Sequence, residues 1–265
     1  MRIVVCIKEV LDPAAVNNYV LAGNLKIAGD GKTLDVSAIP RLINAYDEQA
    51  MEAALRLRDA GADCRITAVS IGRDLHDPLK HCAALGADEI VAIDADPAAL
   101  DHHVVANVLA AYIRNSGGAD LVLCGRQASD DDQGVVAALL GEQLGMPIAP
   151  IARAIAFENG RLRVTRVTPD GDEVVEAAPP AVVTISNELG EPRFPSARDK
   201  MAARKKQPEQ IALSSLGLPA EALQPRVQLI KQYVPEVQGH CEFIDGTPAE
   251  VAARLFEKLR ADKLI

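Results

Sequence analysis

Short apolar runs separated by longer amphipathic segments dominate the first 145 residues of the chain. Each run is rich in Val, Ile, Leu and Ala, a composition typical of a strand that is buried on both faces of a parallel sheet. We therefore expect these runs to be the central strands of the fold. They lie at 2–8, 64–72, 89–93 and 120–124.

The segments between these runs carry helix signals. The clearest begins at Asn44, where Asn44 and Asp47 predict an N-terminus of the capping-box type, and it ends at Gly61. Glu52 and Arg56 predict an ion pair four residues apart on this helix. The alternation predicts a parallel sheet with helices on both faces and right-handed crossovers. Further helices are predicted at 77–85, 101–115 and 135–144.

The pattern changes after residue 150. Four short strand-like runs follow, and the tight-turn dipeptides Asn159-Gly160 and Asp170-Gly171 lie between them. We expect an antiparallel meander added to the parallel sheet. The stretch 10–38 has no periodicity and is predicted to form a long loop or a small hairpin. The four runs are 153–157, 161–167, 173–176 and 181–185.

The last part of the chain reads differently again. The stretch 207–240 contains several prolines and few long apolar runs, so we expect it to bury itself poorly against its own domain. It is then either a flexible tail or an arm that packs on another subunit. Thr247 and Glu250 form a predicted capping box, followed by a helix through Leu259 with one apolar face. An ordered terminal helix favours an arm that packs on another subunit over a flexible tail.

Composition narrows the function classes. The net charge of −9 argues against general binding to nucleic acid or to anionic membranes. No apolar run approaches the roughly 20 residues of a membrane span, so no membrane insertion is expected. Aromatic residues make up 3% and Trp is absent, which argues against large stacking platforms. The chain begins with a strand and shows no signal-peptide pattern, so a cytoplasmic protein is expected.

Cysteine and histidine spacing predicts no metal site. The five cysteines form no CxxC pair, and four of them lie in strand-like or apolar contexts, where Cys is a small buried hydrophobe. We expect all five to be reduced. His102-His103 opens a predicted helix and is expected to be solvated.

The joint at 121–134 is the strongest candidate for chemistry. An apolar strand ends at Gly125, the carboxylates Asp130, Asp131 and Asp132 follow, and a helix begins near Val135. In an open α/β sheet, a loop at the carboxyl end of a strand is where ligands bind. The start of the following helix offers free backbone N–H groups to an anion.

Two alternatives apply to the three aspartates. They can cap the helix, since Asp is a preferred N-cap residue. They can also hold Mg²⁺ in a metal-dependent nucleotide-hydrolysing α/β enzyme, although adjacent side chains alternate in direction and rarely all reach one metal. Neither the GxGxxG nor the GxxxxGK[ST] phosphate loop is present. No nucleophile–base or paired-carboxylate arrangement is evident, so no catalytic residue is predicted.

Several motifs occur in a fixed order: Val5-Cys6-Ile7-Lys8, the helix 50–57, the loop 125–132, the strand 180–184, and Glu191-Pro192-Arg193-Phe194 before a Lys/Arg run. Together they resemble the β subunit of electron transfer flavoprotein over essentially the whole chain. The resemblance implies a Rossmann-like (adenine nucleotide α-hydrolase-like) α/β fold: a parallel sheet with helices on both faces, an added antiparallel β meander, and an extended C-terminal arm ending in a helix.

The resemblance also divides the chain. It implies a nucleotide-binding α/β domain at 1–190 and a partner-recognition loop with an arm that wraps the α subunit at 191–240. A helix that docks on the α subunit would occupy 241–265. The protein would be the small subunit of a heterodimer that carries electrons from flavin dehydrogenases to a membrane-bound quinone oxidoreductase, without substrate turnover of its own.

The cofactors implied are FAD, held mainly by the α subunit and shared at the interface, and AMP in the β subunit, replaced by a second FAD in bifurcating members. The implied nucleotide pocket comprises Cys6, Asn44, Ala45, Tyr46, Asp47, Ile71, Gly125, Arg126, Gln127, Ala128, Ser129, Asp130, Asp131, Asp132, Gln133, Gly134, Val135 and Val136. The implied partner-binding residues are Pro192, Arg193, Phe194, Pro195, Ser196, Ala197, Arg198 and Met201.

The chain departs from the family pattern at three places. Val135-Val136-Ala137 replaces a Gln followed by Val or Thr and Gly, with Gln133 placed earlier, which changes the helix start that would face the phosphate. Asp131 occupies a position where bifurcating members tend to have Gly, which favours AMP over a second FAD. Ala197 replaces the leucine that anchors acyl-CoA dehydrogenases, so a different flavoenzyme is the expected donor.

Overall fold

The computed structural model describes residues 1–234 and 241–265. The chain divides into two compact units, 1–232 and 233–265. The first unit is an α/β domain, and the described residues of the second contain one helix. Across the described residues, no helix combines the length and the apolar character that a bilayer crossing requires.

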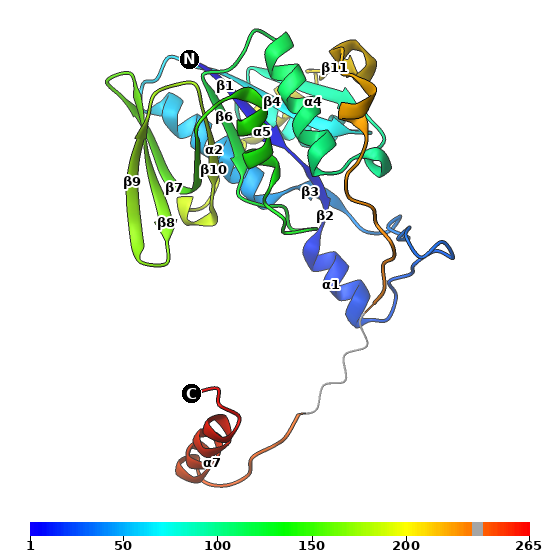
Figure 1. Ribbon diagram of the computed structural model, residues 1–265, viewed down its shortest axis with the longest axis vertical. Coiled ribbons are helices and arrows are strands. Elements are labelled where there is room, and N and C mark those ends of the chain that lie inside the picture. The colour runs from blue at the N-terminus through cyan, green and yellow to red at the C-terminus, as the bar shows by residue number, and fades with distance from the viewer. Residues whose placement is uncertain (235–240) are drawn as a thin grey trace. The chain divides into compact units, whose positions relative to one another are not determined.

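One nine-stranded sheet forms the centre of the first unit, in the order β11-β5-β4-β1-β6-β10-β7-β8-β9 (Figure 1). Neighbouring strands are parallel from β11 through β7, and β7, β8 and β9 are antiparallel. The strands are β1 (Arg2–Ile7), β4 (Arg65–Gly72), β5 (Glu89–Asp94), β6 (Leu121–Gly125), β7 (Ile148–Glu158), β8 (Arg161–Thr168), β9 (Gly171–Ala177), β10 (Ala181–Ile185) and β11 (Glu209–Ala212).

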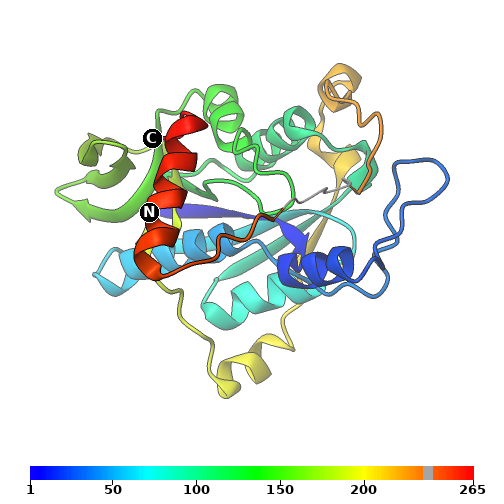
Figure 2. The same cartoon turned by 90° about the horizontal axis from the view of Figure 1, so that it is seen from below.

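Helices cover both faces of this sheet (Figure 2). Alternate residues of β1 enter different cores: Ile3 and Val5 pack with α2 and α3, whereas Val4 and Cys6 pack with α4 and α5. This period of two is the ordinary alternation of a strand, and it confirms the predicted doubly covered α/β fold. The helices are α2 (Ala45–Asp59), α3 (His76–Leu85), α4 (His102–Asn115) and α5 (Val136–Leu144).

The predicted meander is correct for β7, β8 and β9 and wrong for the fourth run. β10 returns into the main sheet and lies parallel between β6 and β7. All five of its residues are buried, as expected of a strand covered on both faces rather than of an outer meander strand.

The stretch predicted as a long loop or a small hairpin contains a helix that the sequence pattern missed. β2 (Glu9–Leu11) and β3 (Arg41–Ile43) form a short antiparallel pair, and α1 (Pro13–Leu21) follows β2. Asp12 caps α1 by accepting a hydrogen bond from the backbone N–H of Ala14. None of the α1 residues is buried by the described chain, so no apolar stripe marked the helix.

The first part of 207–240 is neither a flexible tail nor an arm on another subunit: it packs on its own domain, although only Pro208 and Leu216 within 207–224 are buried. β11 extends the sheet beside β5, and two 3₁₀ turns, η3 (Leu213–Leu216) and η4 (Ala220–Leu223), pack near α4 with Leu216 buried. An open edge strand offers backbone hydrogen bonds to any extended neighbour, which compensates for the lack of a long apolar run. Residues 235–240 lie outside the described part. The remaining short elements are η1 (Pro97–Ala99), η2 (Asn187–Leu189) and α6 (Ala197–Ala203).

The second unit contains α7 (Pro248–Ala261). Its predicted capping box is confirmed: the Thr247 hydroxyl accepts from the backbone N–H of Glu250, and the Glu250 carboxylate accepts from that of Thr247. The described residues bury no part of α7, and Phe256 on it is exposed.

Candidate nucleotide site at the carboxyl edge of the sheet

The carboxyl ends of β1 and β6 and the first turn of α2 meet at one place. Asp47 on α2 joins them: its Oδ2 accepts from the backbone N–H of Lys8 at 2.8 Å, and its Oδ1 accepts from that of Gly125 at 2.9 Å. Asp47 is 6% exposed. Burial raises the pKa of Asp47 to about 7, and the two backbone N–H groups oppose this by favouring the ionised form.

Asn44 fixes the next part of the loop. Its Nδ2 donates to the carbonyl of Gln127 at 2.8 Å, and its Oδ1 accepts from the backbone N–H of Ser129 at 3.2 Å. The predicted capping-box pair of Asn44 and Asp47 is therefore wrong. Both side chains point across to the strand ends and the loop, and the backbone N–H of Asn44 donates to the carbonyl of Lys8 instead.

Close packing requires glycine at two points of the loop. A Cβ at Gly125 would lie 2.4 Å from Asp47 Oδ1 and 2.7 Å from Tyr46 Cβ. Gly134 has a positive φ of 62°, and a Cβ there would lie 2.8 Å from the carbonyl oxygen of Arg126. The end of the loop thus returns to its beginning, which places the start of α5 beside the end of β6.

The aspartates do not cap α5. Lys8 Nζ lies 2.7 Å from Asp130 Oδ1 and 3.4 Å from Asp131 Oδ2, and His102 Nε2 lies 3.0 Å from Asp131 Oδ2. Burial of Asp131 acts to raise its pKa, but the His102 hydrogen bond and the Lys8 charge prevail and lower it. The prediction that His102 is solvated is wrong, because its ring is half-buried against this carboxylate.

Because the acidic side chains turn away, the start of α5 remains open. Its N-cap residue is Val135, and no side chain of the described chain makes a cap hydrogen bond there. The first backbone N–H groups of a helix lack partners inside the helix and attract anions. This arrangement fits a phosphate group, whereas capping by Asp130, Asp131 or Asp132 would have closed it.

Arg126 contributes a cation at the same edge. Its guanidinium lies 5.7 Å from the centroid of the Tyr46 ring and donates from Nη1 to the Ser186 hydroxyl at 3.3 Å. The backbone N–H of Arg126 donates to the carbonyl of Ile185 at 2.9 Å, which ties the loop to the end of β10. In the loop itself, Gln127 Nε2 donates to Asp132 Oδ1 at 2.8 Å.

The sequence-predicted nucleotide residues therefore gather on one sheet edge, but they are not equivalent. Cys6 and Ile71 are the penultimate residues of β1 and β4, and their side chains pack toward the core that faces α4, Cys6 buried and Ile71 partly so. Ala45 and 129–135 are exposed. The predicted partner residues lie on a separate segment, 192–201, and within the described residues no hydrogen bond or ion pair joins this segment to the loop.

Lys8, His102 and Ser186 belong to the site and were missing from the predicted set. A signal was available for the first, because Lys8 directly follows a buried strand and the carboxyl ends of parallel strands share one edge. His102 could not be placed from sequence, since this first residue of α4 meets the loop only through tertiary packing.

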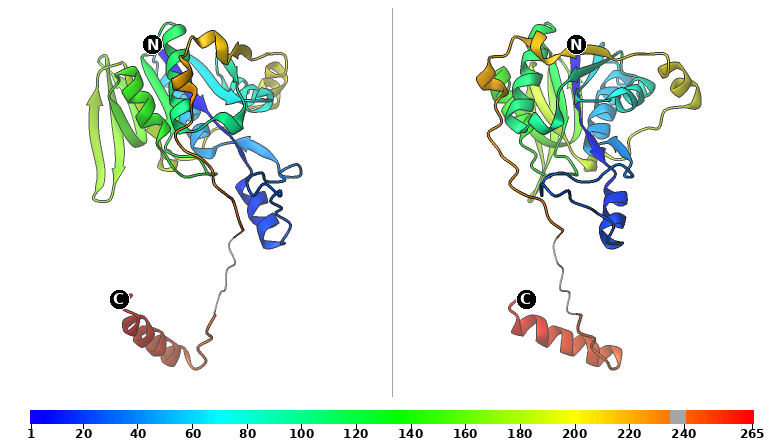
Figure 3. Two further views of the ribbon diagram at one scale, coloured as in Figure 1. Left: turned by 45° about the vertical axis from the view of Figure 1, so that its right-hand side comes forward. Right: turned by 90° about the vertical axis from the view of Figure 1, so that its right-hand side faces the viewer.

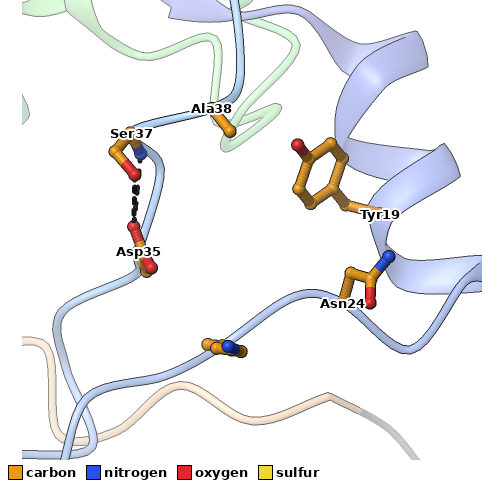
Figure 4. A pocket seen from close by; sticks show the side chains of 6 residues that line it. Tyr19, Asn24, Asp35, Ser37 and Ala38 are labelled. Atoms are coloured by element: carbon orange, nitrogen blue, oxygen red, sulfur yellow. Dashed lines mark hydrogen bonds between the residues drawn. The ribbon is translucent and has the colours of Figure 1, made fainter.

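A cavity of about 280 Å³ lies elsewhere, between α1 and the connection to β3 (Figure 4). Tyr19 and Asn24 face Asp35, Ser37 and Ala38 across it. None of the predicted nucleotide residues lines it, so the candidate site is an open sheet edge and not this cavity.

A mostly parallel sheet with helices on both faces and an open loop at its carboxyl edge defines an α/β protein of the class that binds ligands, nucleotides among them, at this edge. Comparison with known families narrows the class: the Electron transfer flavoprotein domain matches residues 33–216. The chain belongs to the electron transfer flavoprotein β-subunit family. It is thus an electron-transfer flavoprotein subunit that forms a heterodimer with an α subunit.

Three relatives illustrate the match. The caffeyl-CoA reductase–Etf complex subunit CarD of Acetobacterium woodii is 32% identical over the full length of both chains. The electron transfer flavoprotein subunit beta of Megasphaera elsdenii is 34% identical over 78% of this chain and 76% of its own. That of Bacillus subtilis is 30% identical over 83% of this chain and 86% of its own.

Proposed function

We propose that the chain binds AMP at the loop 125–136 and, with its α subunit, carries electrons from flavin dehydrogenases to a membrane-bound quinone oxidoreductase. The observation that carries the AMP assignment is the uncapped start of α5, held open beside Arg126 while Asp130 and Asp131 turn to Lys8 and His102. A phosphate would accept from these N–H groups. The AMP is structural, and no residue of this chain turns over a substrate.

The redox FAD is held mainly by the α subunit, and its binding site is completed at the interface between the two subunits. The flavin supplies the one-electron chemistry, and the residues of the present chain shape and shield its surroundings. The segments 191–240 and 241–265 are the proposed contacts with the α subunit. Exposed apolar side chains at Val227, Ile230 and Phe256 support this, because they lack cover from the described chain.

The donor is a flavoenzyme that contacts 192–201. One full-length relative is named as a subunit of a complex with caffeyl-CoA reductase, which supports an enzyme acting on a CoA thioester as a physical partner of this chain but does not assign that enzyme the donor role. Ala197 offers little apolar surface, which favours a donor other than the usual acyl-CoA dehydrogenases.

Nucleotide content tests the proposal. The heterodimer is co-expressed and purified, its protein is precipitated with acid, and the released nucleotides are separated by chromatography. We expect one FAD and one AMP per heterodimer. Finding neither AMP nor a second FAD would contradict the nucleotide assignment.

A second FAD in place of AMP, as in bifurcating members, is the alternative for the same site. It would appear as two FAD and no AMP in the same chromatogram. The side chain at Asp131, engaged by Lys8 and His102, occupies the point where a smaller residue would leave room, and this favours AMP. The metal-dependent hydrolase would instead turn over ATP with Mg²⁺; among the described residues no group of three or more potential ligands forms a metal site.

A further inference from the structure

The outer face of α2 holds a second segment, 187–193, through polar contacts. Arg56 Nη1 donates to the carbonyl of Leu189 at 2.7 Å, and its Nη2 donates to that of Glu191 at 3.3 Å. Arg193 returns to the helix: its Nε lies 2.7 Å from Glu52 Oε2, and its Nη2 lies 2.7 Å from Asp59 Oδ2. The segment is thus attached to α2 at both of its ends.

Glu52 is the centre of these contacts. It is 5% exposed, yet it accepts hydrogen bonds from Arg56 Nε at 2.8 Å and from both the side chain and the backbone N–H of Arg193. Burial acts to raise the pKa of Glu52, and the hydrogen bonds from the two arginines outweigh this and lower it. A buried ion pair contributes little net stability, so its value here lies in fixing one geometry.

That geometry determines where the next residue points. Because Glu52 binds both the backbone and the guanidinium of Arg193, the chain leaves α2 in one direction. Pro192 and Pro195 flank Arg193-Phe194, and their rings restrict φ and the residue before each of them. Phe194 is consequently presented at low entropic cost, and it is 89% exposed.

α6 packs beside α3, but the side chains before and along it are largely exposed. From 193 to 202 no side chain is buried by the described residues, and Ala203 at the end of α6 is the next buried residue. Met201, on α6, is 68% exposed. α6 and the irregular segment leading to it lie at the margin of the domain (yellow in Figures 2 and 3). Two large apolar side chains thus flank Ala197, where an apolar anchor is expected and absent.

We propose that Phe194 is the apolar anchor for the donor flavoenzyme and that Glu52 and Arg193 are positioning residues that hold it in place. This rests on the proposed role of 192–201 in donor binding. Aromatic side chains are frequent among the few residues that dominate an interface. The occupant expected is a flavin dehydrogenase with an apolar hollow near its electron-exit surface, into which Phe194 inserts.

The test uses the FAD-loaded heterodimer and a panel of purified flavin dehydrogenases, an acyl-CoA dehydrogenase among them, each with its substrate. The donor that reduces the wild type is used to measure KM for the heterodimer and kcat. We expect Phe194→Ala to raise KM at least about tenfold and to keep kcat within about twofold of the wild type. Phe194→Tyr should keep KM near the wild-type value. Glu52→Gln should raise KM similarly and increase amide hydrogen exchange at 190–196, which Phe194→Ala leaves unchanged.

Controls separate the outcomes. Val174→Ala removes an exposed apolar side chain on β9, and Arg161→Ala removes an exposed ion pair; both should keep the wild-type KM. Arg193→Lys replaces Glu52→Gln if the latter folds poorly, since Lys keeps the charge but loses the two-pronged contact. Two outcomes overturn the inference. The first is a wild-type KM in Phe194→Ala. The second is a wild-type KM in both Glu52→Gln and Arg193→Lys although amide hydrogen exchange at 190–196 is faster. If dithionite reduces the wild-type flavin but no dehydrogenase does, the proposed function fails instead.

Discussion

The two segments that α2 holds differ in how they are held. The loop 125–135 is fixed by Asn44 and Asp47, which bind backbone groups and lie buried. The segment 187–193 is fixed by charged side chains, with arginines on the Glu52 carboxylate and on carbonyl oxygens. The first mode sets the path of a backbone, whereas the second sets the direction of an exposed side chain. In the proposed function, one helix therefore positions the nucleotide loop from its N-terminal end and the partner-binding segment from its outer face.

The largest effect of a substitution is expected where the loop 125–135, the proposed nucleotide loop, packs most closely. Gly125→Ala would place a methyl group 2.4 Å from Asp47 Oδ1 and 2.9 Å from the Tyr46 backbone carbon, which cannot move aside. We expect a loss of about 3 kcal/mol in the free energy of unfolding and loss of bound AMP. Urea unfolding and nucleotide content measure both.

Gly29→Ala is the matched control, because a Cβ there meets nothing within 4 Å. It should leave both quantities unchanged. If Gly125→Ala retains AMP and wild-type stability, the loop is not held as tightly as the comparison with 187–193 requires.

The next effect separates the two modes directly. Asp47→Asn keeps one acceptor but turns an NH₂ group toward a backbone N–H that the carboxylate now binds, so a buried donor loses its partner. We expect roughly 2 kcal/mol lower stability and weakened AMP retention. Glu52→Gln is the paired variant: it should lose donor affinity and keep AMP. AMP loss in Glu52→Gln and retention in Asp47→Asn would reverse the assignment of the two sites.

Dependence on pH gives a smaller difference between the two carboxylates. The pKa of Asp47 is raised to about 7, so between about pH 4 and pH 7 the folded chain retains a proton that the unfolded chain has released. Its contribution to stability therefore falls as pH rises through this window. Glu52 has a lowered pKa, so its contribution is complete above the usual carboxylate pKa and is lost only in acid.

Urea unfolding between pH 5 and pH 8 measures this. Because the asparagine variant does not titrate here, we expect the stability difference between wild type and Asp47→Asn to shrink as pH rises to about 7, while wild type and Glu52→Gln change in parallel. A difference from Asp47→Asn that does not vary with pH would mean that Asp47 is ionised throughout.

The sequence predicted the sheet well because buried strands and glycine-ended helices carry local signals. It placed Gly125 and the loop at the correct edge for the same reason. It failed where the partner of a side chain lies far along the chain: Asn44 and Asp47 look like a cap from their spacing of three, but they bind Gln127 and Gly125. β10 was misplaced because a short apolar run does not reveal which strands it joins.

The segment 187–203 shows the same limit. Glu52 and Arg56 were correctly predicted as a pair four residues apart. That Arg193 joins them from a position 141 residues away could not be predicted, because such a contact depends on the path of β7 to β10 and not on any local pattern. The strand ends and the loop can therefore be inferred from sequence. The side-chain contacts that hold them in place cannot, because they join residues far apart along the chain.

The smallest effect concerns the surface charges of the nucleotide loop. Lys8→Met removes the contacts to Asp130 and Asp131. In the shorter pair, the side chains of Lys8 and Asp130 are each more than a third exposed, so solvent screens their attraction. We expect a change in unfolding free energy below about 1 kcal/mol, equal to that of Arg161→Met, which breaks an exposed pair with Glu176 on the meander. AMP content should stay near one per heterodimer. A loss as large as that from Asp47→Asn would mean that surface charge, rather than the buried contacts from α2, holds the loop in place.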